Sequence, residues 1–292
     1  MRSEEMIKLL PSGLREVLQK MNLDVAGLQE IRLRAEQPAV ILSHGKEYVS
    51  QTVIHRRQLE ETLAYLGNYS LYAYEEEIRR GYLSLPGGHR VGIAGRVVVE
   101  DGNIRTITAI SSLNLRFAHQ ILGCADEVIP FLWQDGALQS TLIVSPPGFG
   151  KTTLLRDLIR QLSDGNAYGP GLRVGVVDER SELAGSYRGR PQNDLGMRTD
   201  VLDACPKALG MLLLLRSMSP QVIAVDELGE EQDLRVLHMA ASGGCSLLAT
   251  VHGAGEEDAA RRLGGEYMRE MFARIVILKG RGRMECRCLE GG

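Results

Sequence analysis

In the second half of the chain, short apolar runs alternate with stretches of helical periodicity. The apolar runs are short and rich in β-branched residues, so they predict buried strands. They are Leu142–Ser145, Arg173–Asp178, Gln221–Asp226, Ser246–Val251 and Arg274–Leu278. Between the first two, apolar residues recur at helical spacing from Leu154 to Leu162. Strands that alternate with helices favour a mostly parallel sheet covered on both faces, so this half is predicted to be α/β.

The first half of the chain has a mixed pattern without this regular alternation. Its helical stretches are Ser12–Met21, Arg57–Leu66 and Tyr72–Gly81, and its alternating, strand-like stretches are Leu28–Arg34, Ala39–Ser43, His89–Glu100 and Asn103–Ile110. The last two strands flank Asp101-Gly102, which is a strong hairpin signal. We predict a smaller α+β domain over residues 1–122 and an α/β domain over residues 123–292.

Two further helices are expected in the second domain. One is Ala125–Trp133, which follows the connecting segment between the domains, and the other is a short buried helix around the apolar run Met211–Leu215. The segment Gly165–Gly171 reads as a turn. The long polar segment Gly185–Thr199 carries several arginines, and long loops in compact domains are often functional.

The composition is that of an ordinary soluble protein, with 292 residues, 44% hydrophobic and 24% charged. A formal net charge of −3 gives no global basic field for a nucleic acid. No apolar run approaches the roughly 18 residues that a membrane span needs, and the first residues lack a secretory pattern, so we expect a cytoplasmic protein. The five cysteines are scattered and are more typical of core or surface thiols than of metal ligands.

A glycine-rich segment, Ser145–Thr153 (SPPGFGKTT), lies between the first predicted strand and its helix, which is the context of a phosphate-binding loop. Gly148 and Gly150 let the backbone bend so that N–H groups face the phosphates, Lys151 supplies a charge to them, and Thr152 offers a hydroxyl to Mg²⁺. The usual pattern begins with glycine where this chain has Ser145. The predicted nucleotide-binding residues are Pro147, Gly148, Phe149, Gly150, Lys151, Thr152 and Thr153.

Acidic residues follow two of the predicted strands. Loops beyond the carboxyl ends of strands form the ligand crevice of such sheets, which would place Asp226 and Glu227 beside the phosphate loop. Asp226 is a candidate ligand of Mg²⁺ together with Thr152, and Glu227 is a candidate for orienting or deprotonating the attacking water. Asp178 and Glu179 repeat the pattern, and the sequence leaves open whether either serves the metal or acts as the base.

Two kinds of residue complete the predicted site. Thr250 or His252, at another strand end, is a candidate contact of the γ-phosphate. Phosphoryl transfer also requires positive charge, often an arginine from a neighbouring subunit or domain. The candidates are Arg90, Arg96 and Arg116 of the first domain and Arg188, Arg190 and Arg198 of the long loop. Each of these arginines is also compatible with a solvated surface.

The motifs together resemble the stage III sporulation protein AA family, which is similar to the ATPases of type II and type IV secretion systems and pili. The resemblance covers nearly the whole chain. It is carried by EIRLRA (Glu30–Ala35), GGHRVGIAGR (Gly87–Arg96), SSLNLR (Ser111–Arg116), PPGFGKTTLLRDLIR (Pro146–Arg160), VVDERSELAG (Val176–Gly185), VIAVDELG (Val222–Gly229) and TVHG (Thr250–Gly253).

This resemblance implies a mother-cell ATPase of a spore-forming bacterium that uses ATP and Mg²⁺. It implies a hexameric ring at the cytoplasmic face of a membrane channel complex joining mother cell and forespore, with an N-terminal α+β domain and a RecA-like P-loop ATPase domain. By the same resemblance, Glu179 and His252 lie around the nucleotide and Arg90, Arg96 and Arg116 reach it. The four-cysteine metal module of some secretion ATPases is missing from the sequence.

Three hypotheses about function follow. The first is an ATPase whose hydrolysis of Mg-ATP powers or assembles a secretion-type channel complex. The second is a nucleic-acid motor, which the aromatic content of 5% and the net charge of −3 disfavour, so no stable nucleic-acid partner is expected. The third is a nucleotide-dependent scaffold with little turnover, for which Ser145 leaves room.

Overall fold

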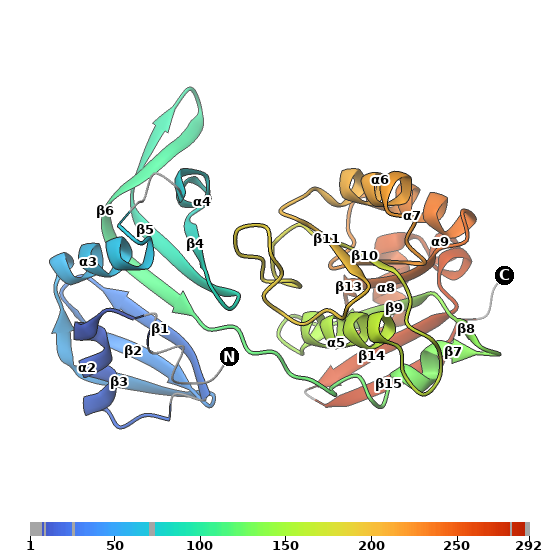
Figure 1. The fold of residues 1–292 in the computed structure, drawn as a ribbon, viewed down its shortest axis with the longest axis horizontal. Helices are drawn as coiled ribbons and strands as arrows, with labels where there is room; N and C mark the ends of the chain where they lie inside the picture. The colour runs from blue at the N-terminus through green and yellow to red at the C-terminus, as the bar shows by residue number, and fades with distance from the viewer. Residues whose placement is uncertain (1–7, 9, 25–26, 70–73, 281, 290–292) are drawn as a thin grey trace. The chain divides into compact units, whose positions relative to one another are not determined.

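The chain divides into two compact units in the computed structural model, Met1–His119 and Gln120–Gly292 (Figure 1). The structure describes residues 8, 10–24, 27–69, 74–280 and 282–289. The division lies close to the boundary expected between residues 122 and 123.

The N-terminal unit has α+β character. Its elements are α2 (Ser12–Lys20), β1 (Leu28–Arg34), β2 (Gln37–Ser43), β3 (Lys46–Ile54), α3 (Arg56–Leu66), α4 (Glu75–Arg79), β4 (Tyr82–Leu85), β5 (His89–Glu100) and β6 (Asn103–Arg116). The predicted helix Tyr72–Gly81 begins outside the described residues, and α4 lies within its remainder. β3 and β4 had no counterpart among the predicted strands.

One six-stranded antiparallel sheet organises this unit, in the order β3-β2-β1-β6-β5-β4. Side chains of a strand alternate between the two faces of a sheet. In β1, Ile31 and Leu33 are buried whereas Arg32 and Arg34 are exposed. α3 packs against β1 and β6 and buries Leu59 and its neighbours, so one face carries the core and the other carries arginines.

The predicted hairpin between β5 and β6 is confirmed. Its turn residues Asp101 and Gly102 have φ of +50° and +76°, the backbone that a tight two-residue turn requires. β6 continues beyond the predicted end at Ile110 as far as Arg116, because its second half pairs with β1. The turn end of the hairpin extends beyond the neighbouring strands of the sheet (Figure 1).

A buried histidine stands where β5 begins. His89 is only 2% exposed, and its Nδ1 accepts a hydrogen bond of 2.9 Å from the backbone N–H of Ala118. Its ring also contacts Phe117, with ring centroids 5.4 Å apart. Burial, and then the charge of His119, lower the pKa of His89 to about 4.

Acidification is therefore expected to destabilise the N-terminal unit. His89 stays neutral in the folded state while the unfolded chain takes up a proton near pH 6.5, so this contribution to stability is full above pH 6.5 and declines as the pH falls toward 4. Between pH 7 and 5.5 we expect a loss of about 1 kcal/mol. Hydrogen exchange of amides in β1 and β6, compared between the parent and His89→Asn, measures it. An equal pH dependence in both proteins would contradict the assignment.

The C-terminal unit is α/β. Its elements are η3 (Ile129–Leu132), β7 (Trp133–Gln134), β8 (Ala137–Leu138), β9 (Thr141–Ser145), α5 (Lys151–Asp164), β10 (Val174–Asp178), β11 (Thr199–Asp203), α6 (Lys207–Ser217), β12 (Val222–Val225), α7 (Glu231–Ser242), β13 (Ser246–His252), α8 (Glu256–Leu263), α9 (Gly265–Met271), β14 (Arg274–Gly280) and β15 (Arg283–Cys288).

The main sheet of this unit has seven strands in the order β11-β10-β12-β13-β9-β14-β15. All neighbouring strands are parallel except β14 and β15, which confirms the prediction of a mostly parallel sheet. Both faces are covered. Ile143 of β9 belongs to the core under α5 and η3, whereas Leu142 and Val144 of the same strand belong to the core under α6 to α9. Burial on both faces explains why these strands are continuous apolar runs.

Two predicted helices differ in the structure. The stretch Ala125–Trp133 forms turns and a short 3-10 helix, η3, because Pro130 has no N–H to donate and would interrupt a continuous helix over the whole stretch, whereas in η3 it stands in the first turn. The helix around Met211–Leu215 is longer than expected and only partly buried. α6 buries Met211 and Leu214, but Leu213 is 54% exposed, since the apolar run passes around the whole circumference while only one side faces the sheet.

The topology brings several strand ends to one edge of the sheet. β9 lies between β13 and β14, and Ser145 at its end pairs in register with His252 at the end of β13. β10 and β12 run parallel to them and end at Asp178 and Val225. The residues that follow these strands therefore share one edge with the loop that leads from β9 into α5.

Candidate active site

The loop between β9 and α5 contains two glycines in left-handed backbone. Gly148 and Gly150 have φ of +79° and +95°, a conformation that costs most other residues about 1–2 kcal/mol. Gly150 is the N-cap of α5, and the first N–H groups of a helix have no partner within it. Ser145, buried at the start of the loop, donates from its hydroxyl to the carbonyl of Pro146 at 2.7 Å. Its hydroxyl is satisfied within the loop.

Lys151 opens α5 and lies almost entirely inside the protein. It is 7% exposed, and its Nζ has no hydrogen-bond partner among the described residues. Burial lowers the pKa of its ammonium, although the nearby Asp226 and Glu227 carboxylates act in the opposite direction. A buried ammonium without a hydrogen-bond partner is unfavourable, and an anion held by the loop would satisfy it.

Asp226 joins the start of α5 to the end of β13. Its Oδ2 accepts a hydrogen bond of 2.7 Å from Thr152 Oγ1, and its Oδ1 accepts one from Thr250 Oγ1. The Thr152 hydroxyl and the Asp226 carboxylate are hard oxygen donors of the kind that Mg²⁺ prefers. The structure thus brings together the two residues predicted as metal ligands.

Glu227 follows Asp226 in an unusual backbone conformation, with φ of +62°. Its N–H donates to Thr250 Oγ1 at 2.7 Å. Its carboxylate lies 3.1 Å from His252 Nε2 through Oε1 and 2.8 Å from Arg180 Nη1 through Oε2. Left-handed backbone is unfavourable for a residue other than glycine, and here it occurs beside Asp226 and the phosphate loop, so Glu227 stays the candidate base.

The acids that follow β10 are engaged elsewhere. The Asp178 carboxylate is 3% exposed and accepts hydrogen bonds of 2.8 Å from the backbone N–H groups of Glu182 and Ala184. Burial raises its pKa, and these hydrogen bonds act in the opposite direction. Glu179 forms an ion pair with Lys207 of α6. Asp178 therefore shapes the loop after β10, and a role of either acid in catalysis stays a prediction.

A comparison with protein families agrees with the motifs. A model of the family described as sporulation stage III, protein AA, matches residues 1–286. The chain belongs to this family. The stage III sporulation protein AA of Bacillus subtilis is 41% identical over 259 residues, which cover 88% of this chain and 84% of the relative. The resemblance identified from the sequence is confirmed.

Solved structures of ATPases share the fold of this sporulation stage III protein AA family member. The ATPase DotB of Legionella pneumophila matches with a TM-score of 0.64 at 15% identity, over 92% of this chain and 76% of DotB. The pilus retraction motor PilT, solved with bound ADP, matches with a TM-score of 0.60 at 15% identity, over 96% of this chain and 82% of that chain. At this identity the likeness shows an α/β fold of the secretion-ATPase kind and no more.

The N-terminal arginines of this family member occupy two places in the first unit. Arg90 and Arg116 are cross-strand neighbours on the arginine-bearing face of the sheet. Arg96 lies on β5 beyond a register shift, opposite Thr108 in the extended hairpin. Whether any of the three serves a nucleotide stays a prediction.

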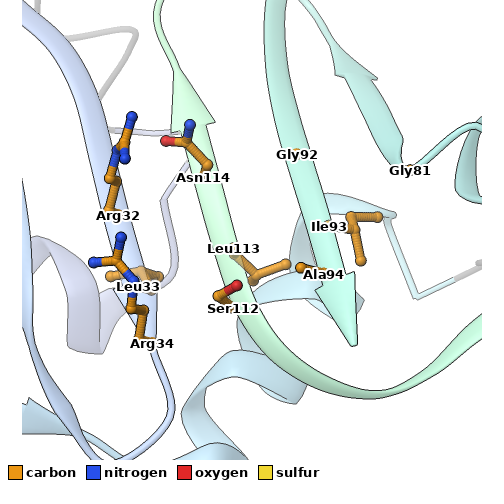
Figure 2. Close-up of a pocket in the computed structure, with 10 residues that line it drawn as sticks. All are labelled: Arg32, Leu33, Arg34, Gly81, Gly92, Ile93, Ala94, Ser112, Leu113 and Asn114. Atoms are coloured by element: carbon orange, nitrogen blue, oxygen red, sulfur yellow. The ribbon is translucent and has the colours of Figure 1, made fainter. Parts of the chain in front are cut away.

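The arginine-bearing face also contains a hollow of about 330 Å³ (Figure 2). The hollow is lined by Arg32 and Arg34 from β1 and by Ser112 and Asn114 from β6. On β5, Gly92 and Ala94 pair across the strands with Asn114 and Ser112, and their lack of large side chains leaves the space open. The hollow belongs to the first unit alone.

Arg180 is a site residue that the sequence motifs do not single out. It stands directly after Asp178-Glu179, and that position at a strand end of the crevice was the only signal for it in the sequence. Its ion pair with Glu227 depends on β10 and β12 being neighbours in the sheet.

Two observations concern membranes and metals. Within the described ranges, no helix is both long and apolar enough to cross a membrane. Over the same ranges, no group of three or more histidine, cysteine, aspartate or glutamate residues is arranged to hold a metal ion. The five cysteines are free thiols.

Proposed function

We propose that this chain is an ATPase that hydrolyses Mg-ATP to power or assemble a secretion-type channel complex between mother cell and forespore during sporulation. The observation that carries the proposal is the Asp226 carboxylate, which links the Thr152 hydroxyl at the start of α5 to Thr250 at the end of β13. This pair of oxygen donors stands beside a phosphate-type loop with a buried lysine that lacks a hydrogen-bond partner among the described residues.

The residues present fit both ATP and Mg²⁺. The loop from Pro147 to Gly150, read as a Walker A loop with serine in its first position, offers backbone N–H groups to phosphate oxygens. Lys151 adds a charge that an anion would satisfy, and Thr153 lies in the same first turn of α5. Thr152 and Asp226 would hold Mg²⁺, which supplies charge neutralisation to the phosphates when bound.

Glu227 is the residue we assign to the attacking water. Its carboxylate lies at the strand-end edge beside Lys151 and Asp226, where it would orient the water and accept its proton. His252 contacts the same carboxylate and would hold its orientation while the γ-phosphate is in place. The positive φ of Glu227 and its backbone bond to Thr250 fix where the side chain begins, so its position is set before substrate arrives.

The wider assembly is part of the same proposal. We infer a RecA-like ATPase domain in a hexameric ring, located at the mother-cell cytoplasmic face of a membrane channel complex. Arg90, Arg96 and Arg116 are proposed to supply positive charge to the transferred phosphoryl group, and Glu179 is proposed as a further acid of the site. Support comes from family membership and from the likeness in fold to DotB and PilT.

The proposal is tested by phosphate release from purified protein over a protein concentration series, with the mass followed by light scattering. With Mg-ATP we expect turnover per subunit to rise as a ring forms, because neighbouring subunits complete such sites. Chelation of Mg²⁺ by EDTA should abolish it. Tight ATP binding without phosphate release at any concentration, with and without the membrane partner's cytoplasmic region, would favour a scaffold. Stimulation by single-stranded DNA would favour a nucleic-acid motor.

A further inference from the structure

The carboxylate of Glu227 is contacted by two side chains, the imidazole of His252 and the guanidinium of Arg180. Oε1 contacts His252, which stands at the end of β13, and Oε2 contacts Arg180, which stands in the turn after β10. Each carboxylate oxygen thus already has one side-chain partner in the same subunit, and these contacts hold the base in place. The guanidinium of Arg180 occupies one of the sites through which Oε2 could bind the attacking water.

The pairing with Arg180 is the easier of the two to break. The Arg180 side chain is 64% exposed, compared with 30% for His252. Ion pairs between exposed side chains contribute little net stability, since water solvates both charges well. Arg180 also stands in a turn, where Ser181 has φ of +53°, and a long flexible stem lets its guanidinium reach more than one acceptor.

The ion pair with Glu227 places Arg180 near the phosphate loop, because Glu227 directly follows Asp226, which accepts a hydrogen bond from Thr152 in the first turn of α5. The charge of Arg180 opposes the ammonium of Lys151 and contributes to the lowering of its pKa, after the larger effect of burial. The carboxylates of Asp226 and Glu227 already offset part of this repulsion. Phosphate oxygens bound by the loop would add negative charge beside both cations and would offer the guanidinium of Arg180 a bidentate partner with more charge than a carboxylate.

We propose that Arg180 is a positioning residue that exchanges partners when ATP binds. This inference rests on the ATPase function proposed above. In the structure described here the guanidinium holds the Glu227 carboxylate. When ATP binds, the guanidinium of Arg180 pairs with the γ-phosphate instead. One oxygen of the Glu227 carboxylate then loses its contact with Arg180 and can bind the attacking water. ADP lacks that phosphate, so Arg180 returns to Glu227 after hydrolysis, and Arg180 thereby favours ATP over ADP.

Nucleotide affinity tests the exchange without relying on turnover. The full chain is titrated with fluorescently labelled ATP and ADP in the parent, Arg180→Gln, Arg180→Lys and the matched control Arg235→Gln, whose exposed arginine pairs with Glu231 on α7. We expect Arg180→Gln to weaken ATP binding about tenfold and ADP binding by less than about threefold. Arg180→Lys should recover part of the loss, and the control should match the parent.

A double-mutant cycle on ATP affinity then isolates the competition between Glu227 and phosphate for Arg180. Glu227→Gln removes the competing carboxylate and should tighten ATP binding about fivefold in the parent, but by less than about twofold in the Arg180→Gln background. Parent-like ATP affinity in Arg180→Gln, or an equal effect of Glu227→Gln in both backgrounds, would overturn the exchange. A parent that binds no ATP would instead overturn the ATPase proposal itself.

Discussion

Replacing Lys151 by methionine is expected to weaken ATP binding about 100-fold and to leave the nucleotide-free protein at least as stable as the parent. The first effect follows because hydrogen bonds to charged groups contribute about 1.5–3 kcal/mol, and Lys151 has no competing hydrogen-bond partner among the described residues. The second follows because an ammonium buried without such a partner is unfavourable, whereas methionine keeps the aliphatic stem and removes the charge.

The two effects of Lys151→Met are measured by nucleotide titration and by thermal unfolding without nucleotide. Lys279→Ala is the matched control, since this lysine is half-exposed on β14 and forms an ion pair with Glu285. Both measurements on the control should stay near those of the parent. The assignment of Lys151 fails if the variant binds ATP as tightly as the parent. A large loss of stability without nucleotide would show instead that the lysine supports the fold.

Much of the C-terminal fold could be predicted because its strands are buried on both faces. Runs such as Val222–Val225 are apolar throughout and are followed directly by charged residues, so the sequence indicates where these strands end. β11 was missed for the opposite reason. Thr199–Asp203 is polar and only half-buried at the edge of the sheet, and its pairing with β10 comes from the tertiary fold.

Helical segments were predicted less well where one residue changes the outcome. The apolar positions of Ala125–Trp133 have helical spacing, which led to the predicted helix. The spacing says nothing about Pro130, whose missing N–H prevents one continuous helix over the stretch. In α6 the apolar run exceeds what one buried helix face needs, and its exposed residues Leu209 and Leu213 carry no local signal that distinguishes them from Met211.

The candidate site divides in the same way between local and tertiary information. The loop glycines, Lys151 and the acids after β12 follow from short motifs, because their chemistry depends on neighbours in sequence. The partners of Asp178 and Glu227 do not. A carboxylate at a strand end can bind the backbone of its own loop, as Asp178 does, or face a neighbouring strand, as Glu227 does. Only the three-dimensional arrangement distinguishes the two.

Replacing Glu227 by glutamine is expected to slow ATP hydrolysis by about 10²–10⁴-fold while ATP binding is retained or tightened. Glutamine keeps the size and the contact geometry of the side chain, but it cannot accept the proton of the attacking water. The loss falls on kcat because the loop, Lys151 and the metal ligands are left intact, and removal of the carboxylate also frees Arg180 to bind ATP. Phosphate release and nucleotide titration on the same preparations measure both quantities.

The structure provides a close control for this variant. Glu230→Gln makes the same substitution at an exposed residue that follows Glu227 in the chain, before α7. If net charge near the strand end were the cause, both variants would lose activity together; if Glu227 acts on water, only the first loses it. Parent-like hydrolysis by Glu227→Gln would move the role of base to another acid. Glu179 is the stronger remaining candidate, because its carboxylate is 40% exposed and held by one lysine, whereas that of Asp178 is bound by its own loop.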